Sequence, residues 1–148
     1  CEADIENWGF KFHMNDVNAT VGLANLQGVD EIIRKHQENA AFYDENLADL
    51  DNITLLTRHS DRKSAFWIYS LLVKDSANFI QYMTKKGIQT SKVHERNDTH
   101  SCVREFKCQW PNLARINNMI VSIPVGWWVS EADREYIVQS IKEWNIEA

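Results

Sequence analysis

The residue types best suited to chemistry gather between positions 94 and 108. His94, His100, Cys102 and Cys108 fall within these fifteen residues, with the spacing H-x5-H-x-C-x5-C. Structural zinc sites hold their ligands in pairs separated by two to four residues, so this spacing does not predict a metal site. Cysteine and histidine also form nucleophilic pairs, but neither a nucleophile elbow nor a third orienting group accompanies them here. The sequence therefore assigns no metal site and no catalytic residue to this segment.

A run of polar side chains, His94-Glu95-Arg96-Asn97-Asp98, follows a stretch that the sequence predicts to be a strand. Arg96 stands out because its planar guanidinium binds a phosphate or carboxylate through two parallel hydrogen bonds. Loops carry binding residues more often than cores do, which favours a ligand site. A solvated surface loop explains the same composition, and on the residues alone it is the preferred interpretation.

Lys11 and His13 flank Phe12 immediately before a long helical pattern. The N-terminus of a helix attracts anions, and these two side chains add hydrogen-bond donors. The sequence predicts either an anion site or the exposed side chains of a connector, and it does not decide between the two.

Trp127 and Trp128 follow Gly126 near the end of the chain. Two adjacent indoles form a platform on which a sugar or a base can stack. Large aromatic side chains more often contribute to a core or an interface, so we expect packing to be their role.

The composition excludes several classes of protein. The chain has 148 residues, 44% of them hydrophobic and 25% charged, as in ordinary globular domains. No apolar run approaches the roughly 18 residues of a membrane-spanning helix. The net charge is −5 and the basic residues are scattered, so neither a nucleic-acid groove nor a membrane-surface patch is expected. Three cysteines and no signal-peptide pattern favour the cytoplasm.

Hydrophobic periodicity predicts the elements that position these side chains. The main feature is one long helical pattern of about 33 residues, which begins near Asn15 or Asp16 and continues to Leu47. Gly22 and Gly28 interrupt it, so the helix either bends there or packs against another backbone. Ordinary helices have about 10–14 residues, and the greater length suggests a helix that joins two domains.

Shorter elements follow the long helix. Strands are predicted at 52–56, 65–73, 88–93 and 118–123. A helix is predicted from Ser76 to Lys86, with Gly87 as its stop, and a last helix begins with a capping box at Ser130. This order predicts an α+β fold, in which a long N-terminal helix packs with a small, mostly antiparallel sheet and flanking helices.

Three motifs stand in an order that a known enzyme family shares. They are residues 9–16 with the helical residues up to Ile32, residues 87–90 continuing to His94, and residues 122–124 followed by residues 130–133. On these motifs the chain resembles the C-terminal part of the DegT/DnrJ/EryC1/StrS family, the fold type I sugar aminotransferases that depend on pyridoxal phosphate. The resemblance covers nearly the whole chain.

The resemblance implies transfer of an amino group from glutamate to a keto sugar carried on a nucleotide. It implies that residues 1–14 connect to a large domain, absent here, that holds the cofactor lysine. Residues 15–148, which include the long helix, would be the small domain. No residue of this chain is then catalytic, and the chain alone is expected to be inactive. The resemblance also implies a homodimer joined through the N-terminal segment and the long helix.

The family's motifs also assign roles to five residues. In the family, the segment before the long helix reaches the neighbouring subunit's site and commonly reads Gly-Tyr-Asn-Tyr-Arg-Met, with the Asn near the cofactor phosphate. Lys11 stands at the Asn position and His13 at the Arg position, so both are expected to bind the cofactor. The loop of His94, Arg96 and Asn97 is expected to border the nucleotide sugar. The family's usual Pro-rich stretch is replaced here by residues 95–100.

Two alternatives stay open at this point. Relatives that lack the cofactor lysine are sugar dehydratases. A freestanding binding or oligomerisation module of the same fold would have no catalytic activity, because fold does not fix function. The coding sequence upstream of Cys1 would distinguish these alternatives from an aminotransferase.

Overall fold

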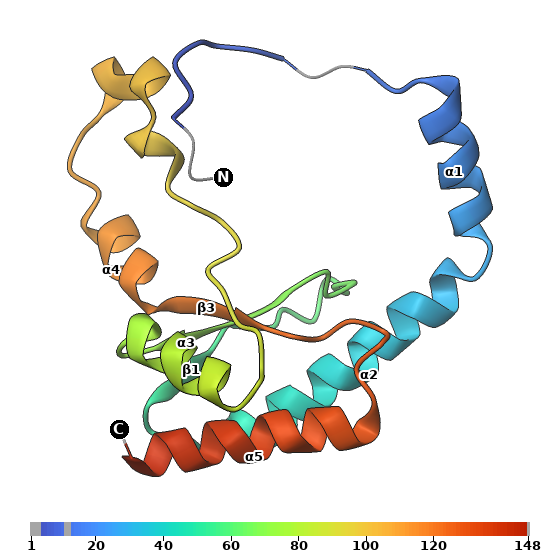
Figure 1. The fold of residues 1–148 in the computed structure, drawn as a ribbon, viewed down its shortest axis with the longest axis vertical. Coiled ribbons are helices and arrows are strands. Elements are labelled where there is room, and N and C mark those ends of the chain that lie inside the picture. Colours follow the sequence, from blue (N-terminus) through green and yellow to red (C-terminus); the bar gives the residue numbers. More distant parts are fainter. Residues whose placement is uncertain (1–3, 11–12, 148) are drawn as a thin grey trace.

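A computed structural model of the chain describes residues 4–10 and 13–147 (Figure 1). At its centre is a three-stranded antiparallel sheet with the strand order β1-β2-β3. The strands are β1 (Ile53–Leu55), β2 (Tyr69–Val73) and β3 (Ile120–Ile123). Ile53 lies opposite Val73 in the first pair, and Tyr69 lies opposite Ile123 in the second. The predicted α+β class with a small antiparallel sheet is confirmed.

Three helices enclose the core beside this sheet: α2 (Val29–Leu47), α3 (Ser76–Lys85) and α5 (Glu131–Glu147). Helix α5 packs along both α2 and α3, and α3 also packs against β2 (Figure 1). The largest fully buried side chains come from all of these elements: Tyr43, Leu47, Tyr69, Leu71, Val73, Phe79, Met83, Val121, Ser140 and Ile141. Because each apolar side chain removed from water contributes roughly 1.5–3 kcal/mol, this cluster holds the helices to the sheet.

The predicted long helix consists of two helices, α1 (Asp16–Leu26) and α2. Gly28 lies between them with a φ of 91°, a left-handed conformation that glycine adopts without a steric penalty. Of the two alternatives that the sequence left open, a bend or close packing of another backbone, the bend is what occurs at Gly28. Gly22 instead lies inside α1, where a Cβ would meet no atom within 4 Å.

Helix α1 extends away from the sheet, and none of its eleven residues, all described, is buried (Figure 1). Asn15 caps it by accepting a hydrogen bond from the backbone N–H of Asn18 at 2.9 Å. Apolar side chains are exposed on several sides of the helix: Val17, Val21, Leu23 and Leu26. A helix that is apolar all round is normally a buried one, so α1 lacks the packing partner that its composition requires.

Asp75, and not Ser76, caps helix α3. The Asp75 carboxylate accepts hydrogen bonds from the first two backbone N–H groups after Ser76, at 3.1 and 3.0 Å. Ser76 is buried, and its hydroxyl donates to the carbonyl of Asn118 at 2.8 Å. Gly87 follows the helix with a φ of 75°, which confirms it as the stop.

Two of the predicted strands differ from the structure. The strand predicted at 65–73 begins only at Tyr69, because Phe66 has a φ of 49°, which no strand residue adopts. The stretch predicted as a strand at 88–93 forms a single antiparallel bridge, between Ser91 and Ser122. Its apolar residue Ile88 is buried without belonging to a strand, so the apolar pattern reflected burial and not sheet pairing.

The segment 94–119 contains helices that the sequence did not predict. Two short 3-10 helices, η1 (Asn97–Thr99) and η2 (Ser101–Phe106), are followed by α4 (Pro111–Met119). The prediction of a strand from 118 was therefore wrong at its start, since Asn118 and Met119 end α4. Pro111 at the first position of α4 is a signal that could have identified this helix, because proline suits the first turn.

Helix α5 begins as the sequence predicted. The backbone N–H of Asp133 donates to the Ser130 hydroxyl at 3.2 Å, and the backbone N–H of Ser130 donates to the Asp133 carboxylate at 3.1 Å. This reciprocal pair satisfies two backbone donors at the helix start. The Ser130 hydroxyl, which donates to the Asp133 carboxylate at 2.6 Å, and the Ser130 backbone N–H together hold the pKa of Asp133 below its ordinary value.

Candidate functional site

The polar loop after residue 93 is organised by an ion pair between Arg96 and Asp98. Arg96 Nε donates to one carboxylate oxygen at 2.8 Å and an Nη donates to the other at 2.5 Å. The two hydrogen bonds hold the pKa of Asp98 below its ordinary value. The guanidinium fork that the sequence suggested for a phosphate is therefore occupied by Asp98 in this structure. Asn97 lies between them, exposed, at the start of η1.

His94 is exposed and packs against an aromatic side chain from another part of the chain. Its ring centroid lies 5.8 Å from that of Trp67, with 57° between the two planes. The indole of Trp67 is 72% exposed. The sequence analysis missed Trp67, because it treated residues 65–73 as one buried strand.

Residues 4–8 lie against η2 and tie the N-terminal segment to this loop (Figure 1). The Asp4 carboxylate accepts from the backbone N–H of Ser101 at 2.8 Å and from its hydroxyl. The backbone N–H of Cys102 donates to the carbonyl of Ile5 at 3.0 Å, and Trp8 makes an edge contact with Phe106 at 6.2 Å. The hydrogen bonds from Ser101 hold the pKa of Asp4 below its ordinary value.

Of the two predicted cofactor-binding residues, only His13 belongs to the described residues, and it does not lie with the polar loop. Lys11 lies outside the described residues. His13 is exposed in the segment before α1, which Figure 1 places across an open ring from residues 94–99. The structure thus brings His94, Arg96 and Asn97 into one loop and leaves His13 apart from them.

The described surface at the start of α1 offers no positive charge to a phosphate. A hollow of about 280 Å³ at the start of α1 is lined by Asp16, Val17, Thr20 and Val21. Its one charged group is a carboxylate, which repels a phosphate.

Trp127 and Trp128 are exposed, to 56% and 65%, so the core is not where they pack. Their loop is held by α2. Asn39 is 3% exposed and donates its side-chain amide to the carbonyls of Val125 and Gly126, at 3.3 and 3.1 Å. The Trp128 ring covers Gly126 so closely that a Cβ there would overlap it.

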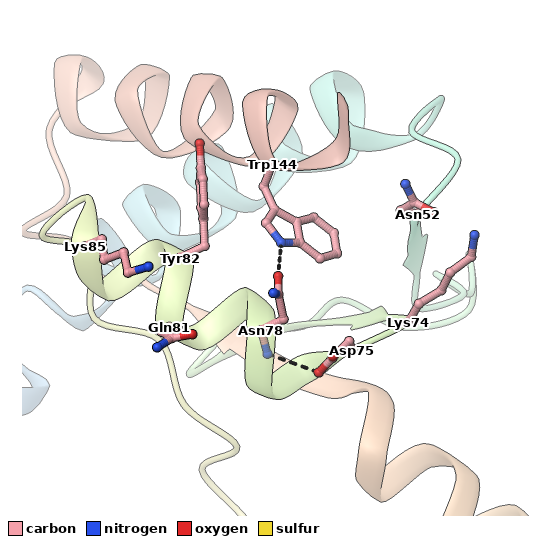
Figure 2. A pocket seen from close by; sticks show the side chains of 8 residues that line it. All are labelled: Asn52, Lys74, Asp75, Asn78, Gln81, Tyr82, Lys85 and Trp144. Atoms are coloured by element: carbon pink, nitrogen blue, oxygen red, sulfur yellow. Dashed lines mark hydrogen bonds between the residues drawn. The ribbon is translucent and has the colours of Figure 1, made fainter. Parts of the chain in front are cut away.

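A polar cavity of about 470 Å³ lies elsewhere on the molecule, between α3 and the end of α5 (Figure 2). Lys74 and Lys85 stand at its two ends. Asn78 lies between them and accepts a hydrogen bond from the indole N–H of Trp144 at 2.8 Å. None of the predicted site residues lines this cavity, so it is separate from the polar loop.

Two further findings concern metals and membranes. Within residues 4–10 and 13–147, no group of three His, Cys, Asp or Glu side chains converges in a way that would hold a metal ion. Across the same residues, none of the helices combines the length and the apolar character needed to cross a bilayer.

The arrangement of α1, the connector and the polar loop matches that of known proteins. The sequence model of the DegT/DnrJ/EryC1/StrS aminotransferase family matches residues 2–142, nearly the whole chain. The chain belongs to this family. The match confirms the family that the three motifs predicted.

Solved structures of the family share this fold. The sugar aminotransferase CalS13 from Micromonospora echinospora is 46% identical, with a TM-score of 0.85 over 92% of this chain and 37% of that one. AtS13 from Actinomadura melliaura is 45% identical, with a TM-score of 0.84 over 95% of this chain and 38% of that one. Among curated relatives, the dTDP-4-amino-4,6-dideoxy-D-glucose transaminase of Shigella dysenteriae is 23% identical over 96% of this chain and 41% of that protein.

The chain of this DegT/DnrJ/EryC1/StrS family member spans 37–41% of the length of these three relatives. These relatives therefore contain much more polypeptide than this chain does.

Proposed function

We propose that this chain is the C-terminal part of a pyridoxal-phosphate-dependent aminotransferase that moves an amino group from glutamate to a nucleotide-linked keto sugar. The observation that carries the proposal is the 46% identity to a sugar aminotransferase over 92% of the chain. The transaminase of Shigella dysenteriae, whose name specifies a dTDP-linked amino sugar, supports a nucleotide-linked substrate. A cytoplasmic location is part of the same proposal.

In this proposal the chain supplies binding surfaces and no catalytic residue. Residues 1–14 connect to a cofactor domain, and residues 15–148 form the small domain. Pyridoxal phosphate, when bound in the parent protein, supplies the electron sink for amino transfer. Lys11 and His13 contribute to holding its phosphate in the site of a neighbouring subunit. The exposed apolar side chains of α1 support a homodimer joined through the N-terminal segment, α1 and α2.

The substrate side of the site is the loop of His94, Arg96 and Asn97. In the resting arrangement Asp98 holds the Arg96 fork in one orientation. A phosphate of a diphosphate also offers two oxygens to the guanidinium fork, so Arg96 can exchange Asp98 for the substrate. The loop thereby presents a preformed cation while no substrate is bound.

The test compares the full gene product with residues 1–148 alone. Each is incubated with pyridoxal phosphate, glutamate and a panel of nucleotide-linked keto sugars, and products are identified by mass spectrometry. The full gene product is expected to form an amino sugar and 2-oxoglutarate in equal amounts, and the chain alone neither. Amino transfer by the chain alone, or none by a correctly folded, cofactor-loaded full product, would overturn the proposal.

A further inference from the structure

Trp67 and His94 form an exposed aromatic pair that packing within the described residues does not explain. Trp67 is among the most exposed large side chains of the described chain, and the His94 ring lies 5.8 Å from it. The two come from segments 27 positions apart and sit beside β2 and the polar loop. The two ring planes are tilted by 57°, so the flat apolar surface offered to solvent is that of the Trp67 indole, with the His94 ring at its edge.

The backbone is strained directly before each member of the pair. Phe66, which precedes Trp67, has a φ of 49°, and Val93, which precedes His94, has a φ of 21°. Within residues 4–10 and 13–147 no other non-glycine residue has a positive φ. Bulky and β-branched residues rarely adopt this region, and such strain is concentrated where proteins position ligand-binding groups.

Contacts around Phe66 hold the strained conformation in place. His36 Nδ1 lies 2.8 Å from the Phe66 carbonyl oxygen, and the Phe66 N–H donates to the Ser64 hydroxyl at 3.0 Å. Gln37 donates to the carbonyl of Ser64 at 2.8 Å. The Phe66 ring stacks against Tyr69, with a centroid distance of 6.2 Å. Strained residues persist where the surroundings fix them in this way.

The side chains of Phe66 and Trp67 therefore differ in burial. The Phe66 ring packs against the core, while the turn at Phe66 directs the next side chain into solvent. A continuous strand would have offered no such turn. The positive φ of Phe66 is energetically unfavourable, and the indole that follows it is exposed beside His94.

We propose that the outer face of the Trp67 indole, with His94 at its edge, is the stacking site for the nucleobase of a nucleotide-linked ligand. The identity of the ligand rests on the proposed function, whereas the stacking site rests on the geometry of residues 66, 67, 93 and 94. Every base has a flat π face that stacks on an aromatic side chain. Arg96 lies two positions after His94, so the diphosphate next to the base falls within the reach of the same loop.

The first experiment measures amino transfer by the full gene product and its Trp67→Ala, Trp67→Phe and Trp127→Ala variants. Trp67→Ala is expected to raise KM for the nucleotide sugar about tenfold or more, as for loss of one base–aromatic stack, with kcat within twofold. Trp67→Phe keeps a ring and restores most of the affinity. Trp127→Ala, which removes another exposed indole, is the matched control and leaves KM unchanged.

A substrate without a base separates stacking from a structural role. With the corresponding sugar 1-phosphate, Trp67→Ala and the parent protein should have the same KM. An equal loss with both substrates would mean that Trp67 supports the fold and not the base, and an unchanged KM for the nucleotide sugar would also overturn the inference. If the alanine variant does not fold, direct observation of the indole in the parent protein keeps the inference testable.

A second experiment observes the indole directly and does not depend on catalysis. The protein is labelled with 5-fluorotryptophan, and the fluorine resonance missing from Trp67→Phe is assigned to Trp67. The diphosphates of uridine, thymidine, guanosine, cytidine and adenosine are the probes, with pyrophosphate as the base-free control. At least one nucleoside diphosphate should shift the Trp67 resonance saturably, and pyrophosphate should not.

The outcomes distinguish this inference from the proposed function. Amino transfer with a Trp67 resonance that no nucleoside diphosphate moves overturns the stacking site alone. A saturable shift in a protein that transfers no amino group overturns the proposed function alone. A Trp67 resonance that does not respond to exchanging H2O for D2O shows that another part of the protein covers the indole, which overturns the stacking site.

Discussion

Asn39 donates its side-chain amide to the backbone carbonyl of Gly126 at 3.1 Å, although 87 residues separate the two in sequence. The same amide reaches the carbonyl of Val125, and Tyr43, one helical turn further along α2, donates its hydroxyl to the carbonyl of Pro124 at 2.8 Å. Helix α2 therefore supplies the hydrogen-bond donors for a loop that has no regular partner of its own. These hydrogen bonds attach residues 124–126, which directly precede Trp127 and Trp128, to helix α2.

Replacing Asn39 by alanine is expected to lower the free energy of unfolding by about 2–3 kcal/mol, because buried carbonyls lose their donor. Denaturant unfolding monitored by circular dichroism measures the change. Asn46→Ala is the matched control on the same helix, since that amide donates only to Phe42 one turn earlier. A loss no larger than that of Asn46→Ala would contradict the assigned role.

Helix α1 should mediate self-association. Replacing Val21 and Leu23 by glutamate places two charges on an exposed apolar surface, and it should shift the full gene product from dimer towards monomer. Sedimentation velocity over a range of concentrations is the measurement. Glu135→Gln, at an exposed position of α5, serves as the control that leaves the distribution unchanged. A glutamate variant that remains fully dimeric would exclude α1 from the interface.

The contact between Asp4 and Ser101 should depend on pH. Hydrogen bonds from Ser101 lower the pKa of Asp4 in the folded protein, so the contact stabilises the fold above the ordinary aspartate pKa. That contribution is lost as the pH falls from about 4 through the lowered pKa. The Ser101 amide proton shift should titrate with a midpoint below the ordinary aspartate pKa, and Asp4→Asn should abolish the titration. A midpoint at the ordinary aspartate value would show that the hydrogen bonds do not persist in solution.

Arg96→Lys in the full gene product should weaken binding of the nucleotide sugar by about 1–3 kcal/mol, the range for a hydrogen bond to a charged group. Lysine keeps the charge but lacks the fork. Pyridoxal phosphate affinity should barely change, because Lys11 and His13 are the residues proposed near that phosphate. Equilibrium titrations with each ligand test both statements. Normal sugar-nucleotide affinity with weakened cofactor binding would mean that the two loops serve the opposite ligands.

Asp98→Asn is the complementary variant at the same ion pair. It removes the carboxylate charge that holds Arg96, so the free guanidinium should bind the substrate at least as tightly as in the parent protein. If both Arg96→Lys and Asp98→Asn leave substrate affinity unchanged, the loop is a solvated surface segment, as its composition alone suggested.

The sequence by itself determined the elements that depend on local interactions. The capping box at Ser130 and the stop at Gly87 are both local, because each is decided by hydrogen bonds or backbone freedom within a few residues. The bend of the long helical pattern at Gly28 has the same origin. Its motifs also identified the family, which lies beyond what periodicity can show.

The tertiary structure decided what depends on distant residues. Residues 88–93 could form a strand only by pairing with a free edge of the sheet. In the structure they make a single bridge to β3, between Ser91 and Ser122. The turn at Phe66, directly before the exposed Trp67, is held in place by His36, 30 residues earlier. Neither contact can be predicted from the local sequence, because a hydrogen bond between distant residues constrains their geometry and not the types of the neighbouring residues.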